Sequence, residues 1–576
     1  MARTALKPRP ISYPLLILLL ILVAAPLLIV LVTAVTGYRE EPSALGSLAD
    51  PEMLTVLGNT IVLSALVVLF ATLMAAPLAV LMSWTRMGRH TWVDVVVMIP
   101  FMTPPFAASM AWMDFTRGGG VAEQILGQAA GGGAHAFIYS VFGMAFIMAC
   151  ELFPFLYLIL RNAFDGVSAS LIESARVMGA SWGAIAGRII APVVAGPYSL
   201  GALIVFIKAA GEFGTPVTLG NAIGFPVLVS AIHQNVTVDP VSFSQAAASS
   251  SVLFGLGVTV WAVQQWAARN DVTSGGRATR RVRLALTSVW AGVAWVYAAV
   301  VFAASVVIPY ISIILGAMTI LRSKLPTPNN LTFDYFGIVL AKRSAREALL
   351  NSAMLGFIGA TLAVIVAVAV ALAAYRRRDP VSKTNDFLAV GPDTVPGIVM
   401  AVGLILLWNA PWLPVTPYGS RWILVVGYAA IFLPMAVQNV KTSLASLSPT
   451  YIEAARVAGA SSLATFARVI LPQLLPGIAA GWLLAFLVGI RELVLVSLIR
   501  PPKLQLLSPW IMNQFEQGHR AEAMAMTLIG VVSSTVILTV VTVLQRRRDH
   551  GRGRTDRGVR GAEETAPDAA STATAA

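Results

Sequence analysis

The chain has 576 residues, of which 57 % are hydrophobic and only 12 % are charged. A soluble domain of ordinary composition is about 45–50 % apolar and about 25 % charged. Several apolar runs are longer than the roughly 18 residues at which a segment becomes a candidate for crossing a bilayer. This composition excludes an ordinary water-soluble protein and predicts an all-α polytopic membrane protein surrounded by a lipid bilayer.

Charge and cysteine content exclude further classes. The net charge is +13, but Lys and Arg lie mostly between the apolar runs and in the tails. Cytoplasmic loops of membrane proteins have this distribution, whereas a nucleic-acid-binding face gathers its basic residues. The single cysteine, Cys150, cannot form an internal disulfide or a multi-cysteine metal site. We therefore expect neither a nucleic-acid partner nor a bound metal.

The chain begins with a basic segment, Met1–Pro10, followed by an apolar run over residues 11–36. A signal peptide also begins in this way, but its apolar core has only 7–15 residues. We therefore expect an uncleaved first helix. Twelve membrane helices are expected in all, at about 12–36, 57–83, 92–113, 137–160, 197–220, 245–267, 287–318, 350–375, 387–408, 421–440, 477–499 and 524–545.

Basic residues set the expected orientation, because Lys and Arg accumulate on the cytoplasmic side. The distribution favours both termini in the cytoplasm. Its clearest markers are the basic residues of the central linker and of two later segments, Arg280, Arg281, Arg283, Arg376–Arg378 and Arg546–Arg548.

An internal repeat divides the chain into two halves. A shift of 280 residues aligns Leu171–Pro192 with Tyr451–Pro472 at 12 identities in 22 positions. The same shift aligns Glu212 with Glu492. Each half has the same order of apolar segments, so we expect two parallel six-helix halves related by an axis along the membrane normal.

The expected organisation has five segments. They are an N-terminal tail with the first helix and an outer loop (1–52), a first repeat (53–268), a cytoplasmic linker with the seventh helix and an outer loop (269–346), a second repeat (347–546) and a disordered cytoplasmic tail (547–576).

The repeated block predicts a helix-turn-helix knob in each half. Capping boxes at Ser170–Glu173 and Thr450–Glu453 would start a short helix, which would stop at Gly179 or Gly459. A serine two residues later, Ser181 or Ser461, is placed to cap a second short helix. That second helix is expected to end near Pro192 or Pro472, with a break or a new helix start there, because proline lacks the backbone N–H.

At this point the residues resemble a known family. Glu453-Ala454-Ala455, Gly459 and Val469-Ile470-Leu471-Pro472 are similar to the EAA loop of permease subunits of binding-protein-dependent ABC importers. The first copy departs from that pattern at Ser174 and Ala191 and keeps its spacing. A loop that merely closes with good caps is the plainer alternative.

The resemblance implies the type I ABC importer permease fold in the bacterial inner membrane, here in a fused form with both halves in one chain. Each EAA loop would seat a coupling helix in one of two copies of a cytoplasmic ATPase subunit, and an extracytoplasmic solute-binding protein would deliver the cargo. The implied coupling residues are Glu173, Ala175, Arg176, Gly179, Glu453, Ala454, Ala455, Arg456 and Gly459.

The motifs that the sequence lacks reduce the number of activities that the chain itself could have. The sequence contains no phosphate-binding Gly-x-x-x-x-Gly-Lys-[Ser/Thr] loop, so ATP and Mg belong in the partner subunit and the chain itself is expected not to be an enzyme. A secondary transporter of the major-facilitator type is also built from two parallel six-helix halves. The segment Trp84–Arg89 faintly resembles its loop, and this class stays as the alternative.

Charged residues inside apolar runs are candidates for function, since burying a charge in lipid is costly. We expect Glu212 and Glu492 to line the translocation path near its outer end, or else to pair with local cations at the outer interface. Lys208 lies four residues before Glu212 and is expected to pair with it. Arg491 is expected to point away from Glu492, and Glu151 to be satisfied locally.

The cargo is the least determined property. Among the permeases that this chain resembles, the fused kind is known from importers of ferric iron, thiamine and 2-aminoethylphosphonate. The paired glutamates favour a cation, so ferric iron is the first expectation.

Overall fold

The computed structural model describes residues 11–269, 282, 284, 287–322, 324, 327–375 and 379–540. The basic N-terminal segment, most of the central linker, Arg376–Arg378 and the predicted disordered tail lie outside these residues. Within the described ranges, ten helices are long and apolar enough to cross a membrane: Ser12–Thr36, Pro51–Trp84, Val141–Asp165, Trp182–Ala210, Phe243–Trp266, Ser288–Met318, Arg343–Ala374, Trp422–Ala445, Ser462–Ile490 and Arg520–Val540. These ten confirm ten of the twelve predicted spans.

The other two predicted spans, 92–113 and 387–408, are bent pairs of helices. Trp92–Pro100 meets Pro105–Thr116 at 87°, and Pro380–Thr394 meets Gly397–Trp408 at 115°. Each break falls just before a proline, at Thr103 and Val395, which adopt extended backbone. The residue before a proline avoids the helical region because the proline ring crowds it. Hydropathy alone did not reveal these bends.

The fifth predicted helix of each half also ends earlier than expected. Helix α10 (Ala191–Ala210) and helix α23 (Leu471–Ile490) end before the predicted limits of 220 and 499. Short helices then follow: Asn221–Ile223 (α11) and Leu228–Thr237 (α12) in the first half, and Val494–Ile499 (α24) and Leu507–Glu516 (α25) in the second. Helix α6 (Val121–Ile138) was expected as an outer loop, and Asp334–Ala341 (α16) is a further short helix.

Within the described residues, four π-turns lie inside the long helices, and each ends two residues before a proline. A proline has no N–H, and its ring crowds the carbonyl four residues earlier. A wider turn relieves that contact and lets the helix continue. The turns are Leu20–Ala24 before Pro26, Ala186–Ile190 before Pro192, Ala303–Val307 before Pro309 and Phe466–Ile470 before Pro472.

The two halves repeat the same order of elements. The first half contains α3 (Pro51–Trp84), α4 (Trp92–Met102), α5 (Pro105–Thr116), α7 (Val141–Asp165), α10 and α13 (Phe243–Arg269). The second contains α17 (Arg343–Ala374), α18 (Pro380–Val390), α19 (Gly397–Trp408), α20 (Trp422–Ala445), α23 and the final helix Arg520–Val540. The predicted internal repeat is therefore present in the fold.

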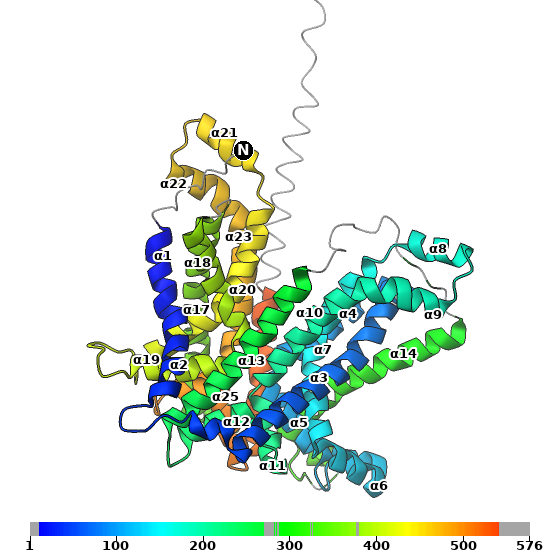
Figure 1. The fold of residues 1–576 in the computed structure, drawn as a ribbon. Coiled ribbons are helices and arrows are strands. Elements are labelled where there is room, and N and C mark those ends of the chain that lie inside the picture. Colours follow the sequence, from blue (N-terminus) through cyan, green and yellow to red (C-terminus); the bar gives the residue numbers. More distant parts are fainter. Residues whose placement is uncertain are drawn as a thin grey trace, which may run out of the picture.

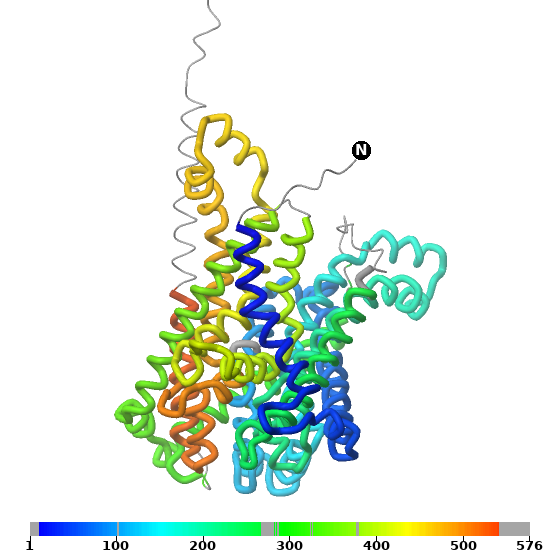
Figure 2. Tube along the Cα trace, turned by 60° about the vertical axis from the view of Figure 1, so that its left-hand side comes forward, coloured from blue at the N-terminus to red at the C-terminus, as the bar shows by residue number. Residues whose placement is uncertain are grey.

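The first helix of each half packs across the molecule. Helices α1 (Ser12–Leu19) and α2 (Ala25–Thr36) lie against α18 and α19 of the second half, and Asn385 Nδ2 donates to the Ser12 carbonyl at 2.9 Å. Figure 2 shows this N-terminal helix, in blue, alongside the yellow-green helices of the second half. Helix α15 (Ile308–Met318) in turn packs against α5. The halves interlock, and one buried apolar cluster contains residues of both.

Candidate functional site

The two predicted knobs project from the same end of the molecule, as Figure 1 shows for α8 (Ala169–Val177) and α9 (Trp182–Ile185) and for α21 (Pro449–Val457) and α22 (Ser462–Thr465). The knobs stand apart at this end, and α1 begins there too. Helices α5, α6, α12 and α25 lie toward the opposite end. Two copies facing the same way are what a parallel repeat requires.

The turn inside each knob is built identically. Gly179 and Gly459 have φ of +82° and +76°, in the left-handed region that glycine adopts at little cost. The following alanine donates back to the helix, Ala180 N–H to the Ala175 carbonyl and Ala460 N–H to the Ala455 carbonyl, both at 2.9 Å. This is a helix stop of the Schellman type, as predicted.

Serine caps the second helix of each knob, also as predicted. The Ser181 hydroxyl accepts from the Ala184 N–H at 3.3 Å, and the Ser461 hydroxyl accepts from the Ala464 N–H at 3.2 Å. These caps fix the direction in which the chain turns back toward the membrane.

The predicted capping boxes at the start of the knobs are wrong. Helices α8 and α21 begin earlier, with Ser168 and Ser448 at the N-cap, and neither of these residues makes a side-chain capping bond. The Ser448 hydroxyl instead lies 2.6 Å from the Thr450 hydroxyl, and the equivalent pair in the first knob is 2.7 Å apart. Pairing between hydroxyl groups competes with capping of the backbone.

Of the two alternatives predicted at Pro192 and Pro472, the chain does not break, and α10 and α23 instead start there with the proline in their first turn. Helix α9 continues through the π-turn Ala186–Ile190 into α10, so that Trp182–Ala210 is one 29-residue helix. Ser462–Ile490 repeats this arrangement with the same length. Each knob is therefore joined rigidly to a membrane helix, a link through which movement of the knob can reach the membrane interior.

The nine predicted coupling residues lie on the outside of the knobs. Glu173, Arg176 and Gly179 are exposed, as are their counterparts Glu453, Ala454, Arg456 and Gly459, whereas Ala175 and Ala455 are half-buried. Large apolar side chains are exposed beside them: Val177 is 89 % exposed and Val457 is 90 % exposed. Apolar groups gathered at the tip of a projecting loop are typical of a surface that a partner covers.

A cavity of about 230 Å³ lies between the two halves. Glu151 from α7, Lys208 from α10 and Glu212 line it from the first half. Arg491 and Glu492, which follow α23, line it from the second half. The structure thus brings the two predicted glutamates together. Because Glu151 lies near the middle of the 25-residue span Val141–Asp165, the cavity is at mid-depth rather than at the outer end that the sequence suggested.

Each predicted carboxylate in this cavity accepts backbone hydrogen bonds from its own chain. Glu212 Oε1 accepts from the Gly214 N–H at 2.6 Å, and Glu212 Oε2 accepts from the Thr215 N–H at 3.1 Å. Glu492 Oε1 accepts from the Leu495 N–H at 3.1 Å. A carboxylate at the start of a short helix satisfies free N–H groups there. This capping explains why the fifth helix of each half ends where it does.

Two other expectations for this region, those for Lys208 and Glu151, are wrong. Lys208 Nζ lies 3.8 Å from a carboxylate oxygen of Asp393, across the boundary between the halves, and not on Glu212. Arg491 lines the same cavity as Glu492, and its Nη1 donates to the Thr103 carbonyl at 3.5 Å. Glu151 is not satisfied locally, since its Oε1 has no hydrogen-bond partner among the described residues.

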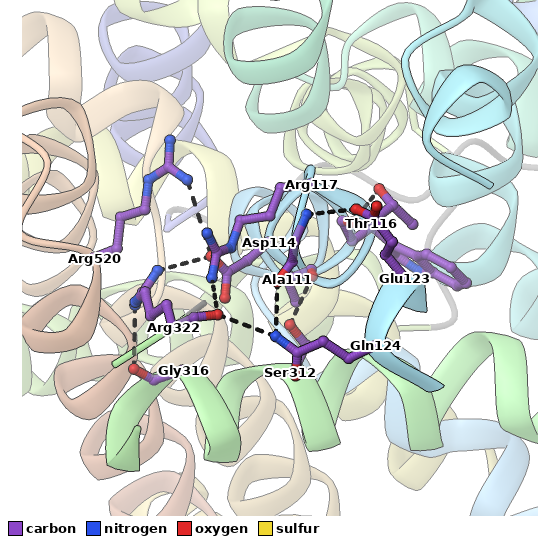
Figure 3. Close-up of polar contacts among 12 residues, drawn as sticks. Ala111, Asp114, Thr116, Arg117, Glu123, Gln124, Ser312, Gly316, Arg322 and Arg520 are labelled. Atoms are coloured by element: carbon purple, nitrogen blue, oxygen red, sulfur yellow. Dashed lines mark hydrogen bonds and ion pairs between the residues drawn. The ribbon is translucent and has the colours of Figure 1, made fainter. Parts of the chain in front are cut away.

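A cluster of arginines around one carboxylate was missed entirely. Asp114, at the end of α5, is only 8 % exposed. Its Oδ1 lies 2.7 Å from Arg322 Nη1, 3.4 Å from Arg117 Nε and 3.9 Å from Arg520 Nη1 (Figure 3). The three arginines come from the start of the α5–α6 loop, the segment after α15 and the start of the last helix. No local pattern in the sequence relates residues so far apart.

Comparison with known proteins agrees with this geometry. Residues 359–552 match the family described as "Binding-protein-dependent transport system inner membrane component". A probable ABC transporter permease of Sinorhizobium fredii is 30 % identical over 353 residues, which is 58 % of this chain and 60 % of the relative. The chain thus spans about three fifths of that relative's length.

Two further relatives carry more specific descriptions. A ferric transport system permease protein of Actinobacillus pleuropneumoniae is 23 % identical over 495 residues, or 84 % of this chain and 70 % of the relative. A spermidine/putrescine transport system permease protein of Haemophilus influenzae is 28 % identical over 208 residues, or 35 % of this chain and 78 % of the relative.

Together, the repeated membrane helices and the two knobs define a multi-pass membrane protein built from two repeated halves. Residues 359–552 are similar to the inner membrane components of binding-protein-dependent transport systems, and this similarity favours that class over the major-facilitator alternative.

Proposed function

We propose that the chain is the membrane pathway of an ATP-driven importer with alternating access. The observation that carries the proposal is the pair of identical knobs, each continuous with a membrane helix that ends at the central cavity. A symmetric pair of docking loops fits two copies of one cytoplasmic partner. In the proposed mechanism, two ATPase subunits seat α8 and α21 through the nine coupling residues and hydrolyse ATP on their own chains.

The cavities support a route between the halves. A larger cavity of about 1040 Å³ is lined by the π-turn Leu20–Ala24, α2, α13, α18 and α20, and Asp393 is one of its lining residues. Lys208 lines the smaller cavity, so the ion pair between Lys208 and Asp393 lies between the two. In our proposal, a solute released by an extracytoplasmic binding protein passes Glu212 and Glu492 and then this ion pair.

Alternating access requires the ATP-bound and free states of the ATPase to differ in affinity for the two membrane conformations. The rigid helices Trp182–Ala210 and Ser462–Ile490 supply the connection, because each begins in a knob and ends next to Glu212 or Glu492. If the ATPase subunits moved the two knobs toward each other, these helices would carry that movement to the cavity walls beside Glu212 and Glu492.

We propose a cation as the cargo, with ferric iron as the first candidate, since a relative that spans most of the chain is a ferric permease. A polyamine is the second candidate, because another relative is a spermidine/putrescine permease and the cavity is lined by three carboxylates. Thiamine and 2-aminoethylphosphonate were expected on architecture alone and have no further support here.

The test is to purify the tagged full chain gently from its native membrane and to identify accompanying proteins by mass and stoichiometry. Two ATPase subunits per chain, together with ATP-dependent uptake by the reconstituted complex, are the expected result. A chain that comes alone even after cross-linking from a cysteine at Ser461, or a complex that transports without ATP, would overturn the proposal.

A further inference from the structure

The Glu151 side chain is buried, and one of its carboxyl oxygens has no hydrogen-bond partner among the described residues. Glu151 is 7 % exposed and lines the central cavity, and its Oε1 accepts no hydrogen bond from any described residue. Buried polar atoms almost always have a partner, and a carboxyl group inside a membrane protein is costly to keep without one. An unsatisfied buried carboxyl group that lines a cavity between two halves indicates a ligand.

The other charged groups of the cavity are already engaged. Glu212 and Glu492 accept backbone N–H groups, Lys208 is paired with Asp393, and Arg491 donates to the Thr103 carbonyl. The cavity holds three carboxyl groups against two cations, and one of those cations is shared with Asp393 outside it. The balance of charge around Glu151 therefore favours a cationic ligand.

The walls of the cavity indicate which kind of cation fits. Apolar side chains line most of it, including Phe106, Leu152, Phe155 and Val488. The ammonium group of Lys208 already lies over the Phe155 ring, 5.2 Å from its centroid. Aromatic faces attract alkylammonium groups, and apolar walls suit their methylene chains.

Carboxyl groups arranged in this way suit amines better than a bare metal ion. Across the described part of the chain, no three His, Cys, Asp or Glu side chains are grouped closely enough to hold a metal. An alkylammonium group has three N–H donors, which carboxyl and carbonyl oxygens can accept one at a time without the close grouping of ligands that a metal ion requires.

We propose that Glu151 is the principal ligand of an alkylammonium site in the central cavity, and that the site takes a short organic diamine. The inference deepens the proposed function, on which it rests, by selecting the amine candidate for the cationic cargo over ferric iron. One ammonium group would bind Glu151, and the second would lie near Glu212, whose carboxylate oxygens can accept further hydrogen bonds.

The test measures binding of radiolabelled 1,4-diaminobutane to the purified full chain in nanodiscs, without ATP or ATPase subunits. We expect saturable binding that unlabelled diamine displaces and that ferric citrate and 2-aminoethylphosphonate do not. The Glu151→Gln variant keeps the shape of the side chain and should bind at least tenfold more weakly, since it removes one partner of a buried charge pair. The matched control is Glu347→Gln, whose carboxylate pairs with Arg343 at 2.6 Å outside the cavity, and it should bind as the wild type does.

A second measurement uses the wild-type chain and so does not depend on the folding of a variant. A hydrophobic carbodiimide labels buried carboxyl groups, and peptide mass spectrometry locates the label. We expect 1,4-diaminobutane to protect Glu151 selectively. Equal labelling with and without diamine, unchanged affinity in Glu151→Gln, or displacement of the diamine by ferric citrate would overturn the inference. Because neither measurement involves an ATPase, failure of this site is distinct from failure of the coupling proposal.

Discussion

The side-chain amide of Asn59 donates to the carbonyl oxygen of Pro226 at 2.9 Å, and the second half repeats this contact. There, Asn351 Nδ2 donates to the Gln505 carbonyl at 3.0 Å. In each half the amide comes from the first long helix of the repeat and holds the loop between the two short helices. The repeat thus extends to individual hydrogen bonds far from the knobs.

The residue after each asparagine accepts a second hydrogen bond, from the first residue of the short helix that follows the loop. Thr60 Oγ1 accepts from the buried Leu228 N–H at 2.9 Å, and Ser352 Oγ accepts from the buried Leu507 N–H at 2.8 Å. These N–H groups belong to the first residues of α12 and α25, which have no carbonyl partner within their own helices. The hydroxyl groups hold the two short helices against the long ones.

Replacing Thr60 with valine should therefore destabilise the chain. The substitution keeps the volume but leaves the Leu228 N–H buried without an acceptor, at a cost of about 1–3 kcal/mol. Thermal unfolding in detergent, followed by tryptophan fluorescence, should show a lower midpoint. Ser352→Ala should lower it similarly, whereas Thr55→Val, which alters an exposed helical hydroxyl, should not. Equal midpoints for all three variants would show that these bonds contribute nothing.

Replacing Gly459 with proline should uncouple ATP hydrolysis from transport. Proline has φ near −65°, so it cannot adopt the φ of +76° on which the turn between α21 and α22 depends. The complex should stay in the membrane and hydrolyse ATP while uptake per ATP falls at least tenfold. Gly419→Pro is the matched control, since Gly419 has φ of +75° in a loop outside the knobs. Normal uptake by the Gly459 variant would count against coupling through this knob.

Hydropathy and the repeat predicted ten of the membrane spans and their order, because lipid imposes a strong, local requirement on each of them. Local rules also predicted Gly179, Gly459, Ser181 and Ser461, whose roles depend on neighbours a few residues away. The bend after Thr103 was missed because hydropathy does not register that a proline displaces the preceding residue from the helical region.

The charged sites were harder to predict because their partners are distant in the chain. Lys208 and Glu212 are four residues apart, so helical spacing favoured their pairing, but the helix ends at Ala210 and turns Glu212 to cap the next segment. Asp393 then becomes the partner of Lys208. Glu151 has no charged counterpart in the repeat, so comparing the two halves could not reveal its place in the cavity.

Replacing Asp114 with asparagine should destabilise the end of the molecule opposite the knobs. Without the carboxylate, the guanidinium groups of Arg117, Arg322 and Arg520 would repel one another in a partly buried space. Burial already lowers the pKa of Arg322, which Asp114 opposes. We expect a loss of about 2–3 kcal/mol, because removing one partner of a buried pair is costly but Arg520 is partly exposed.

The measurement for Asp114→Asn is chemical unfolding at low and high salt. Added salt screens repulsion between the arginines and should recover part of the lost stability. Asp334→Asn, which alters an exposed carboxylate in the first turn of α16, is the control and should change stability little. A loss that salt does not reduce would mean that repulsion is not its cause.

The contribution of Glu41 to the free energy of unfolding should decrease at acidic pH. Burial by itself raises the pKa of Glu41, but hydrogen bonds from the Ser244 N–H at 2.9 Å and the Ser242 hydroxyl at 2.9 Å outweigh it and leave this pKa below its usual value. A carboxyl whose pKa is lower in the folded state than in the unfolded chain stabilises the fold above the unfolded value. That contribution disappears as the pH falls through the folded value. The ionised carboxylate is also favoured at the start of α13 by the helix dipole.

The corresponding variant is Glu41→Gln, which cannot ionise. The unfolding midpoint of the wild-type chain should exceed that of the variant near pH 7, where the carboxylate is ionised in both states. The difference should shrink as the pH is lowered from about 5 toward 3, because a glutamate in an unfolded chain has a pKa of about 4.3. Glu40→Gln, at the neighbouring exposed position, is the control. A difference between wild type and Glu41→Gln that stays constant over this range would show that the capping carboxylate is not its source.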